Sequence, residues 1–460
     1  MRHGGAAVTS PTVVWLRDDL RVADNPALHA AVERGGPIVV LYLHDDVTPG
    51  LRPIGAAARW WLHHSLEALD ASLRELGARL TLRRGAAAEV LPDVVAEVGA
   101  GAVHWNRRYA RAPREVDAGI KTALHEAGVD AHSHQGSLLF EPWTVRTGSG
   151  GPYRVFTPFW RACLDMPEPR APLPAPEHLD EPDGAWRSDD LDDWGLLPRS
   201  PDWAGGLRDA WTPGEAAGLD RLEHFATEVL ADYGQRDHPA QEATSHLSPR
   251  LRWGEVSPFQ VWHRLRGDLP AAAREQAQPF LREVVWREFN HSVLYEADDL
   301  ATVNLRREFD AFPWPEPDPD ELKAWQQGRT GIPLVDAGMR ELWTSGAMHN
   351  RVRLVTASFL VKNLLVDWRL GERWFWDCLV DADEANNPAN WQWVAGSGAD
   401  AAPYFRVFNP VLQQQKFDQH RDYVRHWVPE VDDESYPEPI VDLKDSRRRA
   451  LDAYETMRRS

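Results

Sequence analysis

The sequence predicts a two-part protein: an N-terminal α/β domain with a doubly wound parallel sheet, followed by a larger all-α domain. Three observations lead to this prediction. Short β-rich runs alternate with helical stretches as far as about residue 134, a segment rich in proline, glycine and aspartate follows, and helical periodicity then continues to the end. Strands that alternate with helices are typical of parallel sheets covered on both faces. The predicted divisions are 1–134, a connector at 135–213, and 214–460.

The N-terminal region supplies predicted strands and helices in alternation. The strand candidates are runs rich in β-branched or apolar residues, and the helix candidates have apolar periodicity and end in glycine. No G-x-G-x-x-G sequence follows the first strand, which argues against an ordinary dinucleotide site there. In chain order the predicted strands cover 12–16, 37–43, 78–83 and 101–106, and the predicted helices cover 25–35, 56–77, 88–99 and 115–128.

The remaining chain divides into a connector and a helical region. Proline, glycine and aspartate dominate stretches such as 166–186, so we expect the connector to be a long connection lying over the surface. After it, strand alternation is absent and helical periods follow one another, for example at 280–297 and 349–368.

Composition bounds the class of protein. The 460 residues carry a formal net charge of −19, which argues against a protein that coats nucleic acid everywhere but allows a local basic face. The chain shows neither an apolar run long enough to span a bilayer nor a secretory signal, so we expect a cytoplasmic protein without membrane contact. Two cysteines, Cys163 and Cys378, are too few for a disulfide framework or a four-cysteine metal site. We expect two buried thiols and no metal.

The most unusual stretch runs from Asp381 to Phe405. Its first thirteen residues combine three acids, four side-chain amides and two tryptophans, a mixture that neither a helix period nor a strand period explains. The chain as a whole contains 22 tryptophans, a number that invites an explanation besides packing. The stretch is too aromatic for a solvated loop, so we expect it to hold a ligand.

Hydroxyl side chains precede a predicted helix earlier in the helical region. Thr244, Ser245 and Ser248 lie beside the backbone N–H groups that open this helix, an arrangement suited to a phosphate. The alternative is that they only cap the helix, which is the commoner use of serine and threonine.

Two later predicted helices each carry polar groups on one face. Glu283 lies three residues before Trp286 and four before Arg287, and a carboxylate beside an indole suits a planar heterocycle with N–H groups. The alternative is a surface Glu283–Arg287 pair over a packed tryptophan. Asn350 and Arg353 share a face of the other helix, where the alternative is a polar cluster at a helix start. Together these groups indicate one large ligand with a polyphosphate, hydroxyls and a heterocycle.

Six motifs of the chain resemble, in order, the photolyase/cryptochrome family. They are VVWLRDDLRVADNPAL, YRVFTPFW, TSHLSPRLRWGEVSP, WREF, GIPLVDAGMRELWTSGAMHNRVRLVTASFLVKNLLVDWRLGE and NWQWVAGSGADAAPYFRVFNP. The resemblance is most specific between Ile332 and Pro410. It implies that the helical domain carries FAD in a U shape and that blue light drives electron transfer.

The resemblance implies a set of FAD-binding residues. Arg353 and Asp381 would pair beside the isoalloxazine ring, and Asp383 would lie on the ribityl–adenine side. Asn387 would face flavin N5, where an amide stabilises reduced states. The other FAD-binding residues that the resemblance implies are Tyr233, Thr244, Ser245, Leu247, Ser248 and Arg287.

Within the family, the chain resembles bacterial enzymes that repair cyclobutane pyrimidine dimers. By that resemblance Glu283 and Asn350 would hydrogen-bond the damaged bases, while Trp286 and Trp393 would wall the pocket. Leu354 departs from the dimer-repair pattern, which has methionine there in contact with the lesion. Leucine is apolar and of similar volume, so we expect the exchange to be tolerated.

Two other branches of the family are the alternatives. Enzymes that repair (6-4) lesions carry histidines in place of Asn350 and Leu354, and plant-type cryptochromes, which are blue-light sensors, carry aspartate in place of Asn387. The resemblance therefore favours a deoxyribodipyrimidine photo-lyase, a carbon–carbon lyase. Light-excited reduced FAD, FADH⁻, would donate an electron to a flipped-out dimer, the cyclobutane ring would open, and the electron would return.

The same resemblance implies further partners. Arg236 and Arg351 would hold DNA phosphates around the lesion, and we expect a monomer that needs DNA but no obligate protein partner. Trp391, Trp368 and Trp314 align with the tryptophan chain that reduces FAD under light, the alternative being simple core tryptophans.

An antenna pigment is a further expectation for the N-terminal domain. Family members that use a folate carry a glutamate where this chain has Pro113. A deazaflavin, a folate, another pigment or none all stay open at this point.

Overall fold

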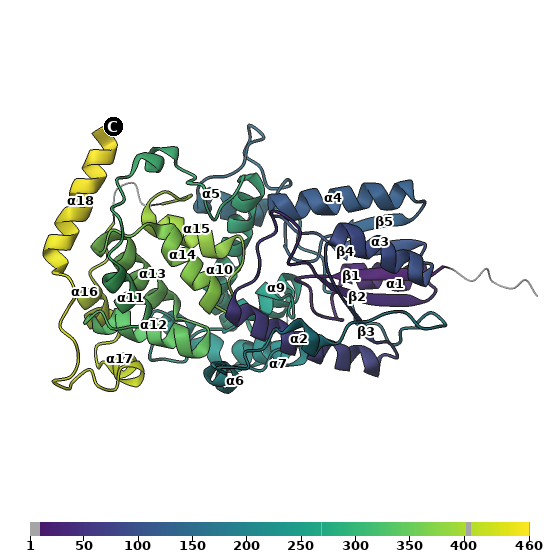
Figure 1. Cartoon of the computed structure of the whole chain (residues 1–460), viewed down its shortest axis with the longest axis horizontal. Helices are drawn as coiled ribbons and strands as arrows, with labels where there is room; N and C mark the ends of the chain where they lie inside the picture. The colour runs from purple at the N-terminus through teal and green to yellow at the C-terminus, as the bar shows by residue number, and fades with distance from the viewer. Residues whose placement is uncertain (1–9, 268, 402–405, 460) are drawn as a thin grey trace, which may run out of the picture.

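The computed structural model describes residues 10–267, 269–401 and 406–459, and it has two bodies side by side along the long axis (Figure 1). A five-stranded parallel sheet with its helices forms one end, and an assembly built almost wholly of helices forms the other. The predicted fold class is confirmed. The exact division at residues 134 and 213 stays a prediction.

The sheet has the strand order β3-β2-β1-β4-β5, with every neighbouring pair parallel. The order reverses between β1 and β4, and a crevice for ligands opens at the carboxyl ends of strands where such a reversal occurs. Four strands match the predicted runs, whereas β5 was not predicted because its sequence, DAHSH, is polar and lies at the sheet edge. The strands are β1 (Thr12–Leu16), β2 (Ile38–His44), β3 (Leu80–Arg84), β4 (Ala102–Asn106) and β5 (Asp130–His134).

Helices cover both faces of the sheet, as the alternating pattern predicts. Buried tryptophans and aliphatic side chains fill the two layers between sheet and helices, with Trp60 and Trp61 on one face and Trp15 and Trp105 on the other. The helices of this domain are α1 (Pro26–Arg34), α2 (Ala56–Glu75), α3 (Ala87–Val98) and α4 (Arg111–Glu126).

The connector differs in part from the expectation of a surface connection. Its helix α5 (Phe156–Asp165) buries Phe156, Phe159 and Cys163 in a core of the helical domain, because these residues recur on one helix face. Short helical turns follow at η1 (Leu191–Trp194) and α6 (Gly205–Ala210). The proline-rich composition hid a helix that belongs to the helical body.

The helical domain packs around two large apolar cores. Its long helix α10 and the shorter α13, α14 and α15 lie together near its middle (Figure 1). Its elements are α7 (Glu215–His224), η2 (Phe225–Val229), η3 (Leu230–Gln235), α8 (Ser248–Arg252), α9 (Pro258–Arg266), α10 (Ala271–Glu296), η4 (Arg307–Ala311), α11 (Pro319–Gln326), α12 (Pro333–Ser345), α13 (Asn350–Ser358), η5 (Phe359–Asn363), α14 (Trp368–Cys378), α15 (Asn386–Ala395), α16 (Pro410–Phe417), α17 (Asp422–Trp427) and α18 (Leu443–Arg459).

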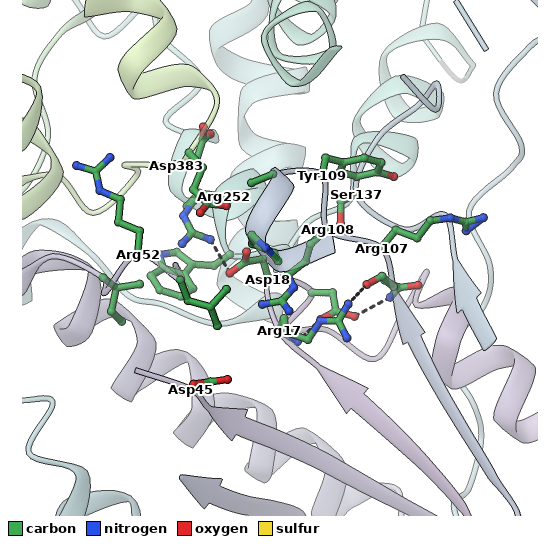
Figure 2. Close-up of a pocket in the computed structure, with 18 of the residues that line it drawn as sticks. Arg17, Asp18, Asp45, Arg52, Arg107, Arg108, Tyr109, Ser137, Arg252 and Asp383 are labelled. Carbon is green, nitrogen blue, oxygen red and sulfur yellow. Dashed lines mark hydrogen bonds and ion pairs between the residues drawn. The ribbon is translucent and has the colours of Figure 1, made fainter. Parts of the chain in front are cut away.

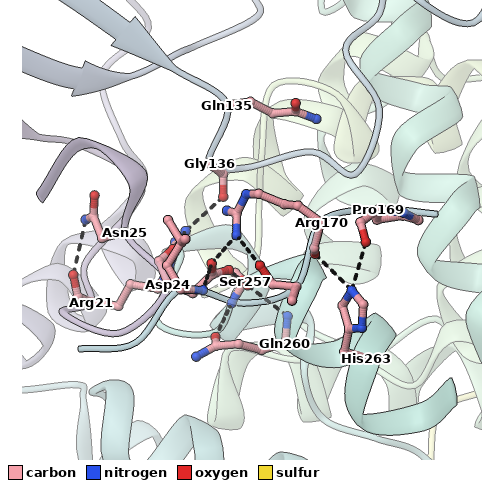
Figure 3. A network of polar contacts seen from close by, with 12 residues as sticks. Arg21, Asp24, Asn25, Gln135, Gly136, Pro169, Arg170, Ser257, Gln260 and His263 are labelled. Carbon is pink, nitrogen blue, oxygen red and sulfur yellow. Dashed lines mark hydrogen bonds and ion pairs between the residues drawn. The ribbon is translucent and has the colours of Figure 1, made fainter. Parts of the chain in front are cut away.

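A buried polar network ties the two domains and the connector together (Figure 3). Arg21, which follows β1, donates to the carbonyl oxygens of Gly254 at 2.9 Å and Gly136 at 2.8 Å. Asp24 accepts from Ser257 of the helical domain and pairs with Arg170 of the connector. Because these groups are buried and hydrogen-bonded, separating the domains would leave several of them unsatisfied.

Two further predictions concern the cysteines and membrane contact. Cys163 and Cys378 are buried and free, as expected. In the part of the chain that the structure describes, no helix combines the length and the apolar character needed to cross a bilayer.

Candidate functional site

The loop before α8 presents the predicted hydroxyl side chains. Arg221 of α7 donates to the backbone carbonyl oxygens of Thr244 at 2.9 Å and Ser245 at 2.8 Å, which holds the loop in place. The residue between this pair and α8, His246, has a positive φ of 52°, a conformation that turns the chain sharply. No side chain in this described loop caps α8, so the helix-capping alternative does not explain the hydroxyls. Within the loop, the Ser245 hydroxyl accepts the N–H of Leu247 at 3.3 Å, and the Thr244 hydroxyl lies 3.1 Å from His246 Nε2.

The structure joins Ser248, Asp381 and Arg353 although they are far apart in sequence. Arg353 binds Asp381 with two hydrogen bonds of 3.2 and 2.9 Å, and Ser248 donates to the same carboxylate at 2.6 Å. The carboxylate is only 6% exposed, and Arg353 is anchored by a 2.7 Å bond to the carbonyl of Met348. Such a two-bond pair fixes both side chains in one orientation.

Asp383 shapes the turn into α15. Its carboxylate accepts hydrogen bonds from the backbone N–H groups of Ala385 and Asn386 and from the Asn386 side chain. Burial acts to raise the pKa of Asp383, but the hydrogen bonds from Asn386 and the nearby Arg287 guanidinium lower it overall. Burial and Arg287 lower the pKa of His291 to about 4, so His291 is uncharged at neutral pH. The hydrogen bonds and Arg287 therefore keep Asp383 ionised.

In the described chain, only the Nδ2 end of the Asn387 side-chain amide has hydrogen-bond partners. Its Nδ2 donates to the Glu372 carboxylate at 2.8 Å and to the Glu372 backbone carbonyl at 3.1 Å. Its Oδ1 has no donor among the residues that the structure describes. Asn387 therefore presents a hydrogen-bond acceptor on its other side.

A second group of predicted residues meets around the N-terminal half of α10. Glu283 lies close enough to Arg236 and Arg282 for their charges to interact, and the Arg236 guanidinium lies 4.8 Å from the centre of the Tyr233 ring. The surrounding protein raises the pKa of Glu283, although Arg236 and Arg282 offset part of this effect. The alternative surface pair with Arg287 does not form in the described chain. Arg287 instead donates to the carbonyl of Ser137 at 2.7 Å.

Trp286 has one face covered by the connector. Its ring stacks on Phe156 of α5 with centroids 3.7 Å apart and planes 7° apart. Phe156 is 1% exposed, whereas Trp286 is only half-buried. One face of the indole is therefore closed by protein, while the residue as a whole stays partly exposed.

The remaining predicted lesion contacts come from two neighbouring helices. Asn350 and Leu354 lie in the first two turns of α13, and Trp393 lies on α15, which packs against both α13 and α10. Asn350 is exposed, and Leu354 and Trp393 are half-buried against the core. No described contact brings these three into one pocket with Glu283, so their shared role stays a prediction.

The two predicted phosphate-binding arginines lie together. His349 donates through its Nε2–H to the backbone carbonyl of Arg236 at 2.8 Å and caps α13 by accepting, at Nδ1, from the N–H of Arg351. Arg351 is held at 2.7 Å by Asp237. A phosphate that binds Arg351 must therefore displace Asp237 from the guanidinium or share the guanidinium with it.

The three predicted electron-transfer tryptophans occupy the helical core. Trp391 is 2% exposed, Trp368 is 1% exposed, and Trp314 is half-buried. The Trp368 indole donates to Asn304 at 3.0 Å. A Cβ atom at Gly371 would lie 2.2 Å from the Trp391 ring, so only glycine allows this close approach of α14. Both core packing and electron transfer are compatible with this arrangement.

A cavity of about 170 Å³ lies at the carboxyl ends of β1, β2 and β4, facing the helical domain (Figure 2). This is the place where the strand order reverses, as expected for a ligand crevice. Several lining groups have buried atoms without a hydrogen-bond partner in the described chain, among them Trp15 Nε1, Arg17 Nε and Asn106 Oδ1. Burial lowers the pKa of Arg17 to about 10, so it stays charged at neutral pH.

The lining of this cavity is polar but balanced. It includes six arginines and six carboxylates, so it does not select an anionic ligand over a neutral one. Arg252, for example, is paired with Asp18 at 2.6 Å. Pro113, the position that separates this chain from the folate-binding pattern, also lines the cavity.

Sequence reasoning missed four residues that position the predicted ones. Phe156 backs Trp286, Glu372 holds Asn387, Arg52 holds Glu372, and Gly371 makes room for Trp391. The motifs YRVFTPFW and DWRLGE contain three of them, so the signal was present. Nothing in the sequence near Arg52 indicates a partner 320 positions away.

Two family models and a curated relative match this chain. A family model described as DNA photolyase matches residues 12–177, and one described as the FAD binding domain of DNA photolyase matches residues 280–435. A deoxyribodipyrimidine photo-lyase from Agrobacterium fabrum is 48% identical over 98% of this chain and 99% of its own length. The chain belongs to the photolyase/cryptochrome family.

Two solved photolyase structures and one cryptochrome show how similar the chain is to individual members of the family. A crystal structure of a bacterial class III photolyase from Agrobacterium tumefaciens matches 99% of both chains with a TM-score of 0.95 and 46% identity. A photolyase from Sulfolobus tokodaii, described as holding two FAD molecules, has a TM-score of 0.83 and 30% identity over 97% of this chain and all of its own. Cryptochrome-1 of Arabidopsis thaliana is 36% identical over 97% of this chain, which covers 70% of that protein.

Proposed function

We propose that this chain is a deoxyribodipyrimidine photo-lyase that uses light and bound FAD to repair cyclobutane pyrimidine dimers in DNA. The observation that carries the proposal is the joining of Ser248, Asp381 and Arg353 in one group. A further support is the Asn387 amide, whose Nδ2 is held by Glu372 while its oxygen has no donor among the described residues. Acceptors, donors and a fixed ion pair in this arrangement fit a flavin. Its near full-length likeness to a deoxyribodipyrimidine photo-lyase supports the same reading.

The protein groups hold the cofactor rather than perform the bond chemistry. Arg353 and Asp381 would bind the edge of the isoalloxazine ring, and the 244–248 loop would bind the ribityl and phosphate portion. The Asn387 oxygen would accept a hydrogen bond from a flavin N–H. When bound and reduced, FAD supplies the electron that light transfers to the lesion.

The lesion would lie on the open face of Trp286. Photolyases are among the enzymes that take the target base out of the stack, and a dimer that stacks poorly makes this step cheaper. Glu283 would hydrogen-bond the polar edge of the damaged bases, and burial raises the pKa of its carboxyl. Asn350 and Trp393 would complete the pocket, with Leu354 as an apolar contact.

The Phe156–Trp286 stack adds a testable positioning role to this proposal. We expect Phe156→Ala to weaken binding of dimer-containing DNA by roughly tenfold and to lower the free energy of unfolding by about 3 kcal/mol. Binding of undamaged DNA should change little, because phosphate contacts do not involve this stack. Equal losses for damaged and undamaged DNA would contradict the role.

Two other functions of the family compete with this one. A cryptochrome-type light sensor is the first, and it is disfavoured by Asn387 and by the Glu283–Trp286 pair. A (6-4) photolyase is the second, and it is disfavoured by Asn350 and Leu354, which stand where that branch carries histidines.

The deciding experiment is illumination of the purified, reduced protein with an oligonucleotide that bears one thymine dimer. We expect the dimer to disappear in blue to near-ultraviolet light but not in darkness. Glu283→Ala should slow repair at least tenfold, whereas Glu275→Ala, an exposed acid of the same helix, should not. If the flavin photoreduces but the dimer survives, dimer repair is excluded, and a (6-4) substrate is the next test.

DNA would bind through Arg236 and Arg351. Because each phosphate contact releases counterions, we expect Arg236→Ala or Arg351→Ala to reduce the salt dependence of binding by about one unit of slope. Salt slopes equal to that of the unaltered protein in both variants would exclude these phosphate contacts.

The cavity at the carboxyl ends of β1, β2 and β4 would hold an antenna pigment. Its unpartnered buried polar atoms support a polar, planar ligand, and the balance of its charges leaves a deazaflavin, a flavin or a folate as the candidates. The absorption spectrum of the purified protein after release of FAD distinguishes them.

We further propose a cytoplasmic monomer that acts without an obligate protein partner. Light scattering at micromolar concentration, with and without DNA, tests the oligomeric state, and a dimeric mass would contradict it.

A further inference from the structure

We propose that Arg52, in the loop before α2 of the α/β domain, is a positioning residue for the flavin site. It acts through Glu372 of α14, and it determines which end of the Asn387 amide faces the flavin. The inference rests on the proposed function, because it requires a flavin beside Asn387. It gives the α/β domain a part in the redox properties of a cofactor bound by the helical domain.

The contact between the two domains is close and buried. The Arg52 guanidinium forms two hydrogen bonds of 2.7 Å with the two carboxylate oxygens of Glu372, whose side chain is 1% exposed. The same guanidinium lies 3.7 Å from the centre of the Trp376 ring, and Trp376 donates to the carbonyl of Pro53 at 2.9 Å. The loop is therefore clamped at two consecutive residues, and Arg52 has little freedom to move.

The Glu372 carboxylate, paired with Arg52, sets the orientation of the amide. A carboxylate only accepts hydrogen bonds, so it must meet the Nδ2 end of Asn387, as it does at 2.8 Å. The Glu372 backbone carbonyl, at 3.1 Å, favours the same orientation. The Asn387 oxygen is then left to face the ligand. A reduced flavin carries an N–H at N5 and needs this acceptor, whereas an oxidised flavin has an acceptor at N5 and gains nothing from it.

Arg52 is the cation that pairs with the buried Glu372 carboxylate. Among the described residues it is the only cation in hydrogen-bond contact with this carboxylate. A buried carboxylate that loses its cation favours the neutral acid, which can donate to Asn387 Oδ1 and allow the amide to turn. The turned amide would offer N–H to the flavin and would favour the oxidised form. Arg52 also lies at the border of the cavity in Figure 2, so both ligand sites share it.

The test measures the ratio of reduced to oxidised flavin in the FAD-loaded protein, held at one fixed potential in a redox buffer. We expect Arg52→Met to lower this ratio about tenfold, the size of one lost hydrogen bond. Arg52→Lys, which keeps the charge but not the two-bond fork, should lower it less. Arg59→Met is the matched control, because Arg59 is exposed on α2 and its side chain forms no described hydrogen bond or ion pair. Its ratio should equal that of the unaltered protein.

A double-mutant cycle separates a positioning role from a loss of folding. If Arg52 acts through Glu372, Arg52→Met should add nothing to the shift caused by Glu372→Gln. Additive shifts, or a flavin-loaded Arg52→Met protein with the unaltered ratio, would overturn the proposal. If Arg52→Met loses its flavin, the same cycle is run with Arg52→Lys, and a shift that persists alongside Glu372→Gln overturns it. An unaltered protein that binds no FAD would instead contradict the proposed function.

Discussion

The candidate flavin site and the cavity at the carboxyl ends of β1, β2 and β4 differ in how their buried polar groups are hydrogen-bonded. In the flavin site, protein partners already hold the polar groups: Arg353 with Asp381, and Asn387 with Glu372. In the cavity, buried atoms of Trp15, Arg17 and Asn106 have no hydrogen-bond partner in the described chain. The first site is organised before any ligand arrives, whereas the second leaves hydrogen bonds for a ligand to make.

This difference suggests how each site depends on its ligand. A site whose side chains support one another keeps its geometry when empty and loses it when one partner is removed. A site with unpaired polar atoms should gain stability on binding, because those atoms recover hydrogen bonds. Four experiments test this contrast, in order of decreasing expected effect.

The largest effect should follow removal of Arg353. We expect Arg353→Met to lower the free energy of unfolding by about 3 kcal/mol, because Asp381 is nearly buried and would lose its cation. Retention of FAD should fall with it. Arg373→Met, an exposed change on α14, should alter stability by less than about 0.5 kcal/mol in the same urea titration. Equal effects of the two changes would show that the flavin site is not held by this pair.

Glu288, a buried acid of α10 that accepts from the N–H of Phe140, should make stability depend on pH. Burial raises its pKa to about 7, although Arg287 and the N–H of Phe140 oppose this. A raised folded-state pKa means that the stabilisation is complete below pH 4.5 and is lost as pH rises through about 7. We expect a decline of up to about 3 kcal/mol between pH 5 and pH 8. Urea titrations at several pH values should show a flatter profile for Glu288→Gln than for Glu275→Gln.

A methyl group added at Gly371, against the Trp391 ring, should have an intermediate effect on the free energy of unfolding. Gly371→Ala would place a methyl group 2.2 Å from the Trp391 ring, and we expect a loss of about 2 kcal/mol together with slower photoreduction of the flavin. Gly119→Ala is the matched control, because nothing lies within 4 Å of a Cβ there on α4. That change should stabilise the protein by about 0.5–1 kcal/mol. Photoreduction at the unaltered rate in Gly371→Ala would argue against an electron path through Trp391.

The smallest effect should come from filling the cavity. A pigment present at ten times its Kd should stabilise the protein by about 1.4 kcal/mol, seen as a rise in Tm. A deazaflavin, FMN and a methenyl-folate would be compared, with FAD already bound in the helical domain. If none of them raises Tm, the unpartnered atoms of the cavity do not mark a pigment site.

The sequence predicted most of the architecture because the strongest signals were local. Apolar runs at β1, β2, β3 and β4 and glycine-terminated helical periods indicated a parallel sheet with helices on both faces. The polar edge strand β5 lacks such a signal. The connector helix α5 was hidden by proline-rich neighbours, so its packing against Trp286 could not be foreseen.

Some features of the candidate site were likewise indicated by local sequence, and others were not. The residue types and motifs alone determined the family resemblance, the FAD expectation, and the pairing of Arg353 with an acid of the 381–405 stretch. Only the tertiary structure decided that Ser248 joins that pair, that Arg287 turns away from Glu283, and that Arg52 reaches Glu372 across the domain boundary. Local patterns encode helices, strands and motifs, but contacts between residues hundreds of positions apart depend on how the finished elements pack.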